Sequence, residues 1–350
     1  MSVASAVSEA LSFTLTPAHE AGAPPEARGL ERDEVRMLVA RRDGAGLVHD
    51  RFRGLPDHLR AGDLLVVNTS ATLPAALRAT RPDGTAVDLH LSTPVPQAST
   101  DRWVVELRRA GARVRSAGAG ERLALPGGGS AELLASYLSP GRLWVAALEL
   151  PVPLHRYLAE HGRPIAYSHL ARPRPLRDLQ TVFADEPGSA EMPSAGRPFT
   201  RRLLDELKGR GVEVAPLVLH TGVASLERGE RPYPERYRVP ATTASRVNAH
   251  RAAGGRVIAV GTTVVRALET LAAPDGRVEA GGGWTGLMIT PERGVRAIDG
   301  LITGWHEPDA SHLLMLEAVG GRDLIERSYD AALTAGYRWH EFGDSHLILR

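Results

Sequence analysis

The stretch GGRVIAVGTTVVRALE, residues 254–269, carries an apolar run, then a glycine, two threonines and a second apolar pattern. The run before Gly261 predicts a buried strand, and the spacing of the apolar residues after it predicts a helix. Ligands of α/β sheets bind where a strand gives way to the following helix. Gly261 lets a ligand approach the backbone closely, and Thr262 and Thr263 offer hydroxyl and N–H groups at a helix N-terminus. The stretch therefore predicts a strand–helix unit with a ligand at its turn.

The same turn also has a purely structural interpretation, in which the glycine bends the chain and the threonines cap the helix. Arg266 and Glu269 lie one helical turn apart. They form either a solvated ion pair worth about 0.2–0.5 kcal/mol or two groups that face the ligand. Both interpretations stay open at this point.

The sequence around this unit predicts more elements of the same kind. Apolar runs indicate strands at 35–39, 64–68, 212–220, 284–289 and 345–350. Helical spacing indicates a short piece at 55–59 and helices at about 152–162, 200–211, 241–254, 312–320 and 323–336, with Thr200 as an N-cap. Residues 1–30 show little periodicity and predict a mostly extended arm.

Residues 76–149 show a different sequence pattern. Short β-like runs such as AVDLHL and RWVVELR alternate with turn-forming segments such as PGGGS and SPG. Regular short strands with such turns are typical of a small barrel or sandwich. Because helices and strands alternate in the rest of the chain, we predict an α/β fold. It consists of a layered main domain of residues 1–75 and 151–350, with a small β-barrel domain inserted at 76–150.

Composition excludes several classes of protein. The 350 residues contain no cysteine, which excludes disulfides, thiolate nucleophiles and zinc–thiolate sites. The formal net charge is +1, so no overall field attracts nucleic acid or a membrane. No run approaches the roughly 18 apolar residues of a membrane span, and MSVASAVSEALSFTL lacks the basic start of a signal peptide. We expect a cytoplasmic protein.

Two histidines stand at the ends of predicted strands. His220 ends LVLHTG, and His306 lies in TGWHEP. An imidazole with a pKa near 6.5 suits proton transfer at such a position, although a single histidine is more often structural. No histidine pair with metal-ligand spacing has carboxylates nearby in the sequence, so we expect no metal site.

The segment GSAEMPSAGRPFTRRLLDEL, residues 188–207, joins small residues, including Ser194 and Gly196, to a capped helix. Such a loop either packs against a flat ligand or simply connects two elements. The sequence contains no P-loop, G-x-G-x-x-G or G-x-S-x-G pattern, which disfavours nucleoside-triphosphate and serine-hydrolase chemistry. Arg172, Arg174 and Arg177 form a basic cluster that suits phosphates, although a solvated surface explains it better.

Taken together, many blocks resemble the S-adenosylmethionine:tRNA ribosyltransferase-isomerases of queuosine biosynthesis. The resemblance covers roughly residues 25–350 and is weakest in the β-rich middle. The blocks that follow the family's order are RDEVRMLV (32–39), FRGLPDHLRAGDLLVVN (52–68), LQTVFA (179–184), GSAEMPSAGRPFT (188–200), LVLHTG (217–222), GGRVIAVGTTVVRALE (254–269), WTGLMI (284–289), DGLITGWHEP (299–308), HLLMLEAVGGR (312–322) and YRWHEFGDSHLIL (337–349).

The resemblance implies an α/β body with an inserted β-barrel and an enzyme, a transferase-isomerase, that needs no metal. Such enzymes transfer the ribosyl carbons of S-adenosylmethionine to 7-aminomethyl-7-deazaguanine in tRNA, releasing adenine and methionine and leaving an epoxycyclopentanediol group. The proposed chemistry begins with proton abstraction beside the sulfonium, whose charge acidifies the adjacent carbon.

The resemblance also implies roles for individual residues. His220 and His306 are the candidates for proton transfer. The candidates for binding S-adenosylmethionine or the acceptor are Gly261, Thr262, Thr263, Arg266, Glu269, Asn68, Gln180, Thr181, Ser194 and Gly196.

Several blocks depart from the family's pattern. Its N-D-T-R is replaced by Asn68-Thr69-Ser70-Ala71, so the aspartate and the arginine are absent. The histidine of P-T-A-G-L-H-F-T is Pro198, the asparagine of N-F-H-L-P is Gly304, and RPYPERY leaves Glu235 alone after His220. Three functions stay open: the family reaction on tRNA, action on a small-molecule acceptor or by elimination, and nucleoside or RNA binding without turnover. We favour the first, in a monomeric enzyme.

Overall fold

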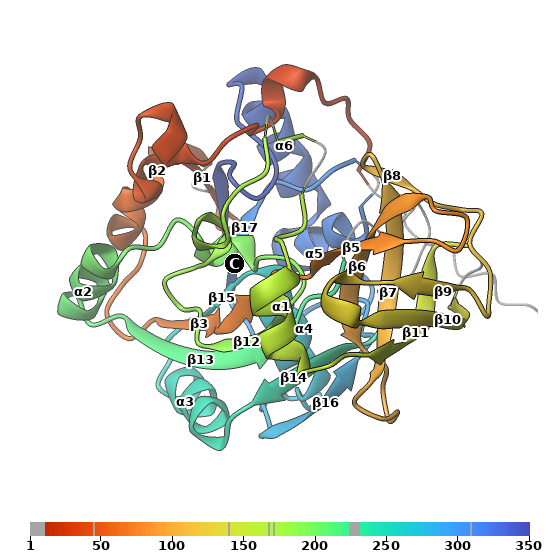
Figure 1. Ribbon diagram of the computed structural model, residues 1–350. Coiled ribbons are helices and arrows are strands. Elements are labelled where there is room, and N and C mark those ends of the chain that lie inside the picture. Colours follow the sequence, from red (N-terminus) through yellow and green to blue (C-terminus); the bar gives the residue numbers. More distant parts are fainter. Residues whose placement is uncertain are drawn as a thin grey trace, which may run out of the picture.

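The computed structural model describes residues 11–350 apart from 45, 139–140, 167–168, 171, 224–231 and 309. Its largest element is a nine-stranded sheet (Figure 1). The strands are β1 (Arg36–Arg41), β2 (Leu47–Arg51), β3 (Leu64–Asn68), β13 (Glu213–Leu219), β14 (Glu235–Val239), β15 (Val257–Val260), β16 (Gly281–Thr285), β17 (Gly300–Gly304) and β18 (Ser345–Leu349). Their order is β16-β14-β13-β3-β15-β17-β18-β1-β2.

The four strands β13, β3, β15 and β17 run parallel to one another in the middle of this sheet. Their carboxyl ends therefore meet at one edge. Every residue of β3 and β15 is buried, as expected for parallel strands with both faces covered. The edge at which these strands end is the natural place for a ligand.

Helices cover both faces of the main sheet. They are α2 (Arg201–Gly209), α3 (Ala241–Ala252), α4 (Thr262–Thr270), α5 (Ser311–Gly320) and α6 (Arg322–Thr334), whereas α1 (Leu154–His161) packs elsewhere. Leu64 and Val66 of β3 pack in one core with side chains of α3 to α6. Leu65 and Val67 point the other way, into a core shared with α2. This alternation is the two-residue period of a strand between two layers.

Six strands close into a separate barrel, at the right of Figure 1. They are β5 (Ala76–Thr80), β6 (Ala86–Pro94), β7 (Arg102–Arg109), β9 (Arg122–Ala124), β10 (Ser130–Tyr137) and β11 (Leu143–Glu149), with β8 (Ala112–Arg113) as an extension of β7. The pairing of β11 with β7 closes the barrel. The predicted fold class, a layered α/β fold with an inserted β-barrel, is therefore confirmed.

The exact division into domains stays a prediction. The barrel strands lie within the predicted insert of residues 76–150, but Tyr157 and Leu158 of α1 pack into the barrel core. We propose that α1 belongs to the same folding unit, because its two fully buried side chains contact the barrel.

Short elements complete the fold. β4 (Ser70–Thr72) and β12 (Glu186–Ser189) form a two-stranded parallel pair beside the main sheet. The 3-10 turns are Pro17–His19, Pro25–Arg28, Arg32–Glu34, Phe52–Asp57, Pro126–Gly128, Leu176–Leu179 and Ser194–Gly196. None of the helices within the described ranges is long and apolar enough to cross a membrane.

Most predicted helices are confirmed, including the cap at Thr200, whose hydroxyl accepts a hydrogen bond from the Leu203 N–H at 3.2 Å. The predicted strand at 284–289 is wrong in its bounds: β16 covers Gly281–Thr285 and pairs with β14. Three of its five residues are glycines without side chains, so backbone pairing determines this strand rather than apolar alternation. The piece predicted at 55–59 is a 3-10 turn over Phe52–Asp57 with Pro56 inside.

The barrel core gives a test of packing. Leu89 of β6 is fully buried there, so Leu89→Ala should lower the free energy of unfolding by about 2–5 kcal/mol. Leu134 of β10 is 36% exposed. Leu134→Ala should therefore change the free energy of unfolding by no more than about 0.5 kcal/mol. Urea denaturation measures both. Equal effects would contradict the described barrel interior.

Candidate functional site

Four of the predicted residues gather at the carboxyl edge of the parallel strands. Asn68 ends β3, His220 follows β13, Gly261 follows β15, and His306 lies two residues beyond the end of β17. Parallel pairing brings these positions to one edge although they are far apart in the sequence.

Asn68 joins the elements of this edge. Its buried amide nitrogen donates to the Leu219 carbonyl at 2.8 Å and to the Thr263 hydroxyl at 3.3 Å. Its amide oxygen accepts from the N–H groups of Leu219 and Ser70 at 3.0 and 3.1 Å. One side chain thus fixes β3 to β13 and to the start of α4.

Gly261 forms the turn that the sequence singled out. Its φ of +100° is rarely adopted by other residues, and its N–H donates to the Ile302 carbonyl at 2.8 Å. A Cβ at this position would lie 3.4 Å from the Cβ of Ala195. The turn over Ser194–Gly196 therefore sits against the start of α4. Thr262 is partly exposed there, and its hydroxyl has no hydrogen-bond partner among the described residues.

His220 is held on both sides of its ring. The Ser70 hydroxyl lies 2.8 Å from Nδ1, and Glu186 lies 3.5 Å from Nε2. The Thr221 N–H donates to the Ser189 hydroxyl, which lies 2.6 Å from that of Ser70. In the arrangement that this order allows, Ser189 donates to Ser70, Ser70 donates to Nδ1, and the proton on Nε2 faces Glu186.

The surroundings of His220 favour its neutral form. Burial lowers its pKa below the ordinary value, and the Glu186 carboxylate opposes that shift. The ring also lies against the backbone of Gly188, where an added Cβ would be only 2.3 Å from Nδ1. Both ring nitrogens are thus occupied by protein groups.

Arg266 and Glu235 form a buried ion pair. The remaining donors of the guanidinium bind the carbonyls of Thr285 at 2.9 Å and Leu287 at 3.2 Å. Glu235 accepts from the Gly222 N–H at 2.9 Å. The pair connects α4 with β14, β16 and the segment after His220, so Arg266 supports the site from behind Thr262 and Thr263.

Two other candidates have structural partners in this structure. Glu269 accepts from the N–H groups of Arg296 and Ala297 at 2.7 and 2.8 Å and pairs with Arg293. Gln180 exchanges two hydrogen bonds with the backbone of Thr72. These contacts leave little of either side chain for a ligand, and their binding roles stay predictions. Glu269 does not pair with Arg266, which was one of the alternatives.

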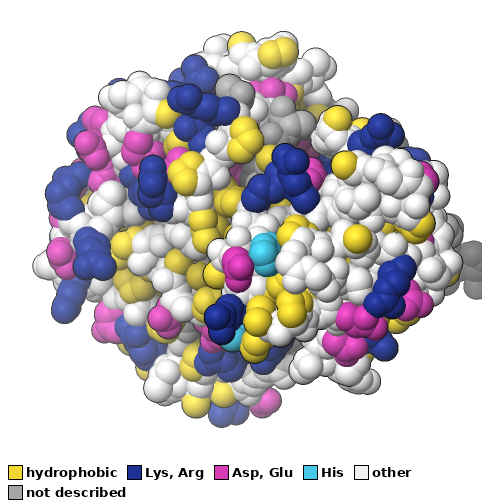
Figure 2. Space-filling view, viewed as in Figure 1, with side chains coloured by type: hydrophobic (Ala, Val, Ile, Leu, Met, Phe, Trp, Pro, Cys, Tyr) yellow, Lys and Arg dark blue, Asp and Glu magenta, His cyan; other side chains and the backbone are white. Residues whose placement is uncertain are grey.

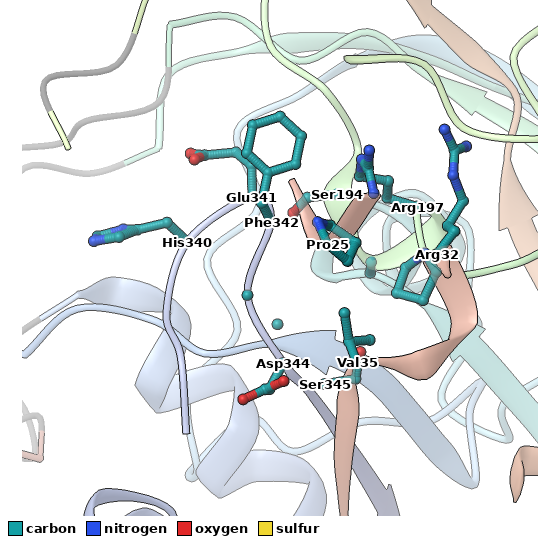
Figure 3. A pocket seen from close by; sticks show the side chains of 14 residues that line it. Pro25, Arg32, Val35, Ser194, Arg197, His340, Glu341, Phe342, Asp344 and Ser345 are labelled. Carbon is teal, nitrogen blue, oxygen red and sulfur yellow. The ribbon is translucent and has the colours of Figure 1, made fainter. Parts of the chain in front are cut away.

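Thr181, Ser194 and Gly196 lie around the turn that touches Gly261. Thr181 accepts from the Phe183 N–H at 3.2 Å, and a Cβ on Gly196 would lie 3.4 Å from the methyl group of Thr181. Ser194 lines a pocket next to this turn (Figure 3). Arg197, Phe342 and Gly304 line the same pocket, and the Arg197 guanidinium lies 4.8 Å from the centre of the Phe342 ring.

His306 stands at the other end of the edge. Its Nε2 lies 2.9 Å from the Thr303 hydroxyl, and its ring stacks on that of His312 with centres 4.6 Å apart and planes 12° from parallel. Its carbonyl accepts from the Trp339 indole at 2.9 Å. Burial and the neighbouring imidazoles hold the pKa of His306 well below its usual value.

The sequence does not mark four further residues of this site, which are His312, Ser70, Ser189 and Glu186. His312 stands in the block HLLMLEAVGGR, which reads as an ordinary apolar helix. Ser70 and Ser189 are small polar residues in short segments without periodicity. Only the pairing of β4 with β12 brings them to His220, and no local pattern signals that pairing.

A fourth histidine is buried behind the site. His346 of β18 is fully buried, neither ring nitrogen has a hydrogen-bond partner, and its ring stacks on Trp305 with centres 4.6 Å apart. Burial lowers its pKa to about 3. His346 therefore contributes an uncharged ring to the wall behind His306.

Charges on the molecular surface are mixed. On the face shown in Figure 2, Lys and Arg side chains are scattered among Asp and Glu rather than gathered in one patch. Within the described ranges, no three His, Asp or Glu side chains are grouped so that they could hold a metal ion.

Comparisons with known proteins agree on one family. A family model described as "Queuosine biosynthesis protein" matches residues 8–348. The chain is 38% identical to the S-adenosylmethionine:tRNA ribosyltransferase-isomerase of Moorella thermoacetica, over 97% of this chain and 99% of that protein. It is 35% identical to the enzyme of the same name from Geobacter sulfurreducens, over 93% and 97%. The crystal structure of S-adenosylmethionine tRNA ribosyltransferase from Thermotoga maritima matches with a TM-score of 0.55 and 28% identity, over 97% and 99%.

His346 makes the stability of the fold depend on pH. An unfolded chain binds a proton at this histidine below about pH 6.5, whereas the folded chain does so only near pH 3. The contribution of His346 to stability is therefore fully present above pH 6.5 and is lost as the pH drops towards 3. In His346→Phe, the loss between pH 6.5 and 4.5 should be smaller by about 2 kcal/mol.

Urea denaturation at a series of pH values measures this difference. His155→Phe is the matched control, because His155 lies on the surface of α1 and its replacement should leave the pH dependence as it is. If His346→Phe kept the wild-type pH dependence, the buried neutral state of His346 would be disproved.

Proposed function

The chain belongs to the queuosine biosynthesis family of S-adenosylmethionine:tRNA ribosyltransferase-isomerases, and we propose that it catalyses that family's reaction. S-adenosylmethionine donates its ribosyl carbons, and the aminomethyl group of 7-aminomethyl-7-deazaguanine in tRNA accepts them. Adenine and methionine leave. The observation that carries the proposal is the match over almost the whole chain, which includes the main sheet and the barrel.

The carboxyl edge of the parallel strands is the proposed place for S-adenosylmethionine. Gly261 gives access to the backbone, and the free hydroxyl of Thr262 and the N–H groups at the start of α4 suit the polar edges of a ribose or a carboxylate. Asn68 orients Thr263 beside them.

The first chemical step needs a group that removes a proton from the ribose carbon attached to the sulfonium sulfur. The positive charge on sulfur makes this carbon more acidic, so a neutral imidazole is a suitable base. His220 uses both ring nitrogens for Ser70 and Glu186. We therefore propose that proton transfer occurs at the end of β17, where His306 and His312 stack, and that His220 supports the edge.

Action on a small-molecule acceptor, or elimination from S-adenosylmethionine, is the second candidate. The mixed charge of the face in Figure 2 and the net charge of +1 favour it, because tRNA binding usually relies on a basic surface. The near-complete match to tRNA-modifying relatives favours the first candidate. We also propose that the protein acts in the cytoplasm as a monomer.

An assay of adenine release separates the candidates. Incubation with S-adenosylmethionine and tRNA that carries 7-aminomethyl-7-deazaguanine should release one adenine per modified nucleoside, with the product identified by mass spectrometry. The control is the same tRNA with guanine at that position, which should give neither product. Adenine released from S-adenosylmethionine alone would favour elimination, and no adenine in any mixture would contradict catalysis.

Substitutions locate the proton transfer within the site. A side chain that takes the proton contributes about 10²–10⁴-fold to the rate. The double variant His306→Gln/His312→Gln should lose turnover in this range, whereas His220→Gln should lose less than about tenfold. Turnover of each variant is measured at saturating S-adenosylmethionine and tRNA. The opposite order of effects would assign the step to His220.

A further inference from the structure

We propose that His312 is the catalytic base of the site and that His306 positions it. This inference rests on the proposed function and identifies one proton acceptor within it. It follows from the hydrogen bonds of the two rings, their stacking and the position of Arg266.

The two stacked histidines differ in what their rings contact. His306 has Nε2 against the Thr303 hydroxyl, and its backbone is held by Tyr329 and Trp339. His312 is partly exposed and makes no hydrogen bond to any described residue. Its two ring nitrogens are not fully buried. A ligand can therefore reach the ring of His312 through its nitrogens.

His312 lies near the helix at whose start we propose that the sulfonium nucleoside binds. It lies at the start of α5, and Arg266 of α4 is close enough to disfavour a positive charge on its ring. Arg266 stands one turn after Thr262 and Thr263, on the helix that begins at the proposed ligand turn. The pKa of His306 is lowered by the imidazoles of His312 and His346 instead. Arg266 thus connects His312 with the helix that begins at the turn.

Stacking and charge prepare His312 for this step. The parallel ring of His306, held by Thr303, fixes the orientation of the His312 ring. Burial and Arg266 lower the pKa of His312 to about 4, so the ring is neutral above about pH 5. A low pKa weakens a base, and the sulfonium compensates by acidifying the carbon.

The step itself is a single proton transfer. The C–H bond at the ribose carbon next to sulfur breaks, the proton goes to a ring nitrogen of His312, and the electron pair stays on the carbon beside the sulfonium. The resulting imidazolium lies near the Arg266 guanidinium, a like charge that favours release of the proton. His312 is then neutral again for the next turnover.

Phenylalanine substitutions separate the base from its support, because a phenyl ring keeps a stacking face but has no nitrogen. His312→Phe should lower turnover by about 10²–10⁴-fold, with S-adenosylmethionine still bound in calorimetry. His306→Phe should lower turnover by less than about tenfold. His155→Phe, on the exposed side of α1, is the matched control and should behave as the wild type.

An isotope effect gives a readout that a structural role would not change. S-adenosylmethionine is deuterated at the ribose carbon attached to sulfur, and turnover is compared with the unlabelled compound. Loss of the base slows proton abstraction, so the isotope effect should increase in His312→Phe and stay at the wild-type value in His306→Phe. His312→Asn repeats the measurement if the phenylalanine variant does not fold.

The outcomes distinguish this inference from the function on which it rests. If the wild type releases no adenine with the modified tRNA, the proposed function fails. If the wild type is active and His312→Phe and His312→Asn keep wild-type turnover, the inference about His312 is wrong. A greater loss and a larger isotope effect in His306→Phe would make His306 the base.

Discussion

The buried amide of Asn68 is the interaction on which the site depends. A side-chain amide has two donors and an acceptor oxygen, and Asn68 uses them on the backbone of Leu219, on Ser70 and on Thr263. These hydrogen bonds therefore fix β3, β13 and the start of α4 to one another at the edge of the sheet. Aspartate at this position would present two acceptors to the Leu219 carbonyl, so the arrangement needs an amide.

From this fixed edge the supporting contacts extend in two directions. Towards β13, Ser70 and Ser189 order the ring of His220 and leave it facing Glu186. Towards β15 and β17, α4 carries Arg266, whose ion pair with Glu235 secures the strands at the end of the sheet. The hydroxyl of Thr262 and the ring of His312 make no hydrogen bond to any described residue and so remain available to a ligand.

Much of the fold could be predicted because its central strands and helices have long apolar patterns. β3 and β15 are buried on every residue and read as apolar runs, and α2 has a cap at Thr200 that the sequence marks. β16 and β12 were not predictable in the same way, since glycine, proline and polar residues form much of them. Their existence depends on partners distant in the sequence, which local patterns do not report.

The candidate site was predictable in its position but not in its contacts. Strand-end reasoning places Asn68, His220, Gly261 and His306 at one edge, and the structure brings them there. The sequence does not show that both nitrogens of His220 have partners or that His312 stacks on His306, because those facts depend on side-chain directions. Burial of Glu269 against the backbone of Arg296 likewise has no signal in the spacing of α4.

The closed barrel has a consequence for how this enzyme can change. Its first strand begins at Ala76, whose backbone exchanges two hydrogen bonds of 2.8 Å with Arg163 just after α1. The chain thus leaves the main body and returns to it at nearly the same point. In the main body, the barrel therefore takes the place of a short loop. Mutations can reshape the outer surface of the barrel without shifting the strands that carry the chemistry.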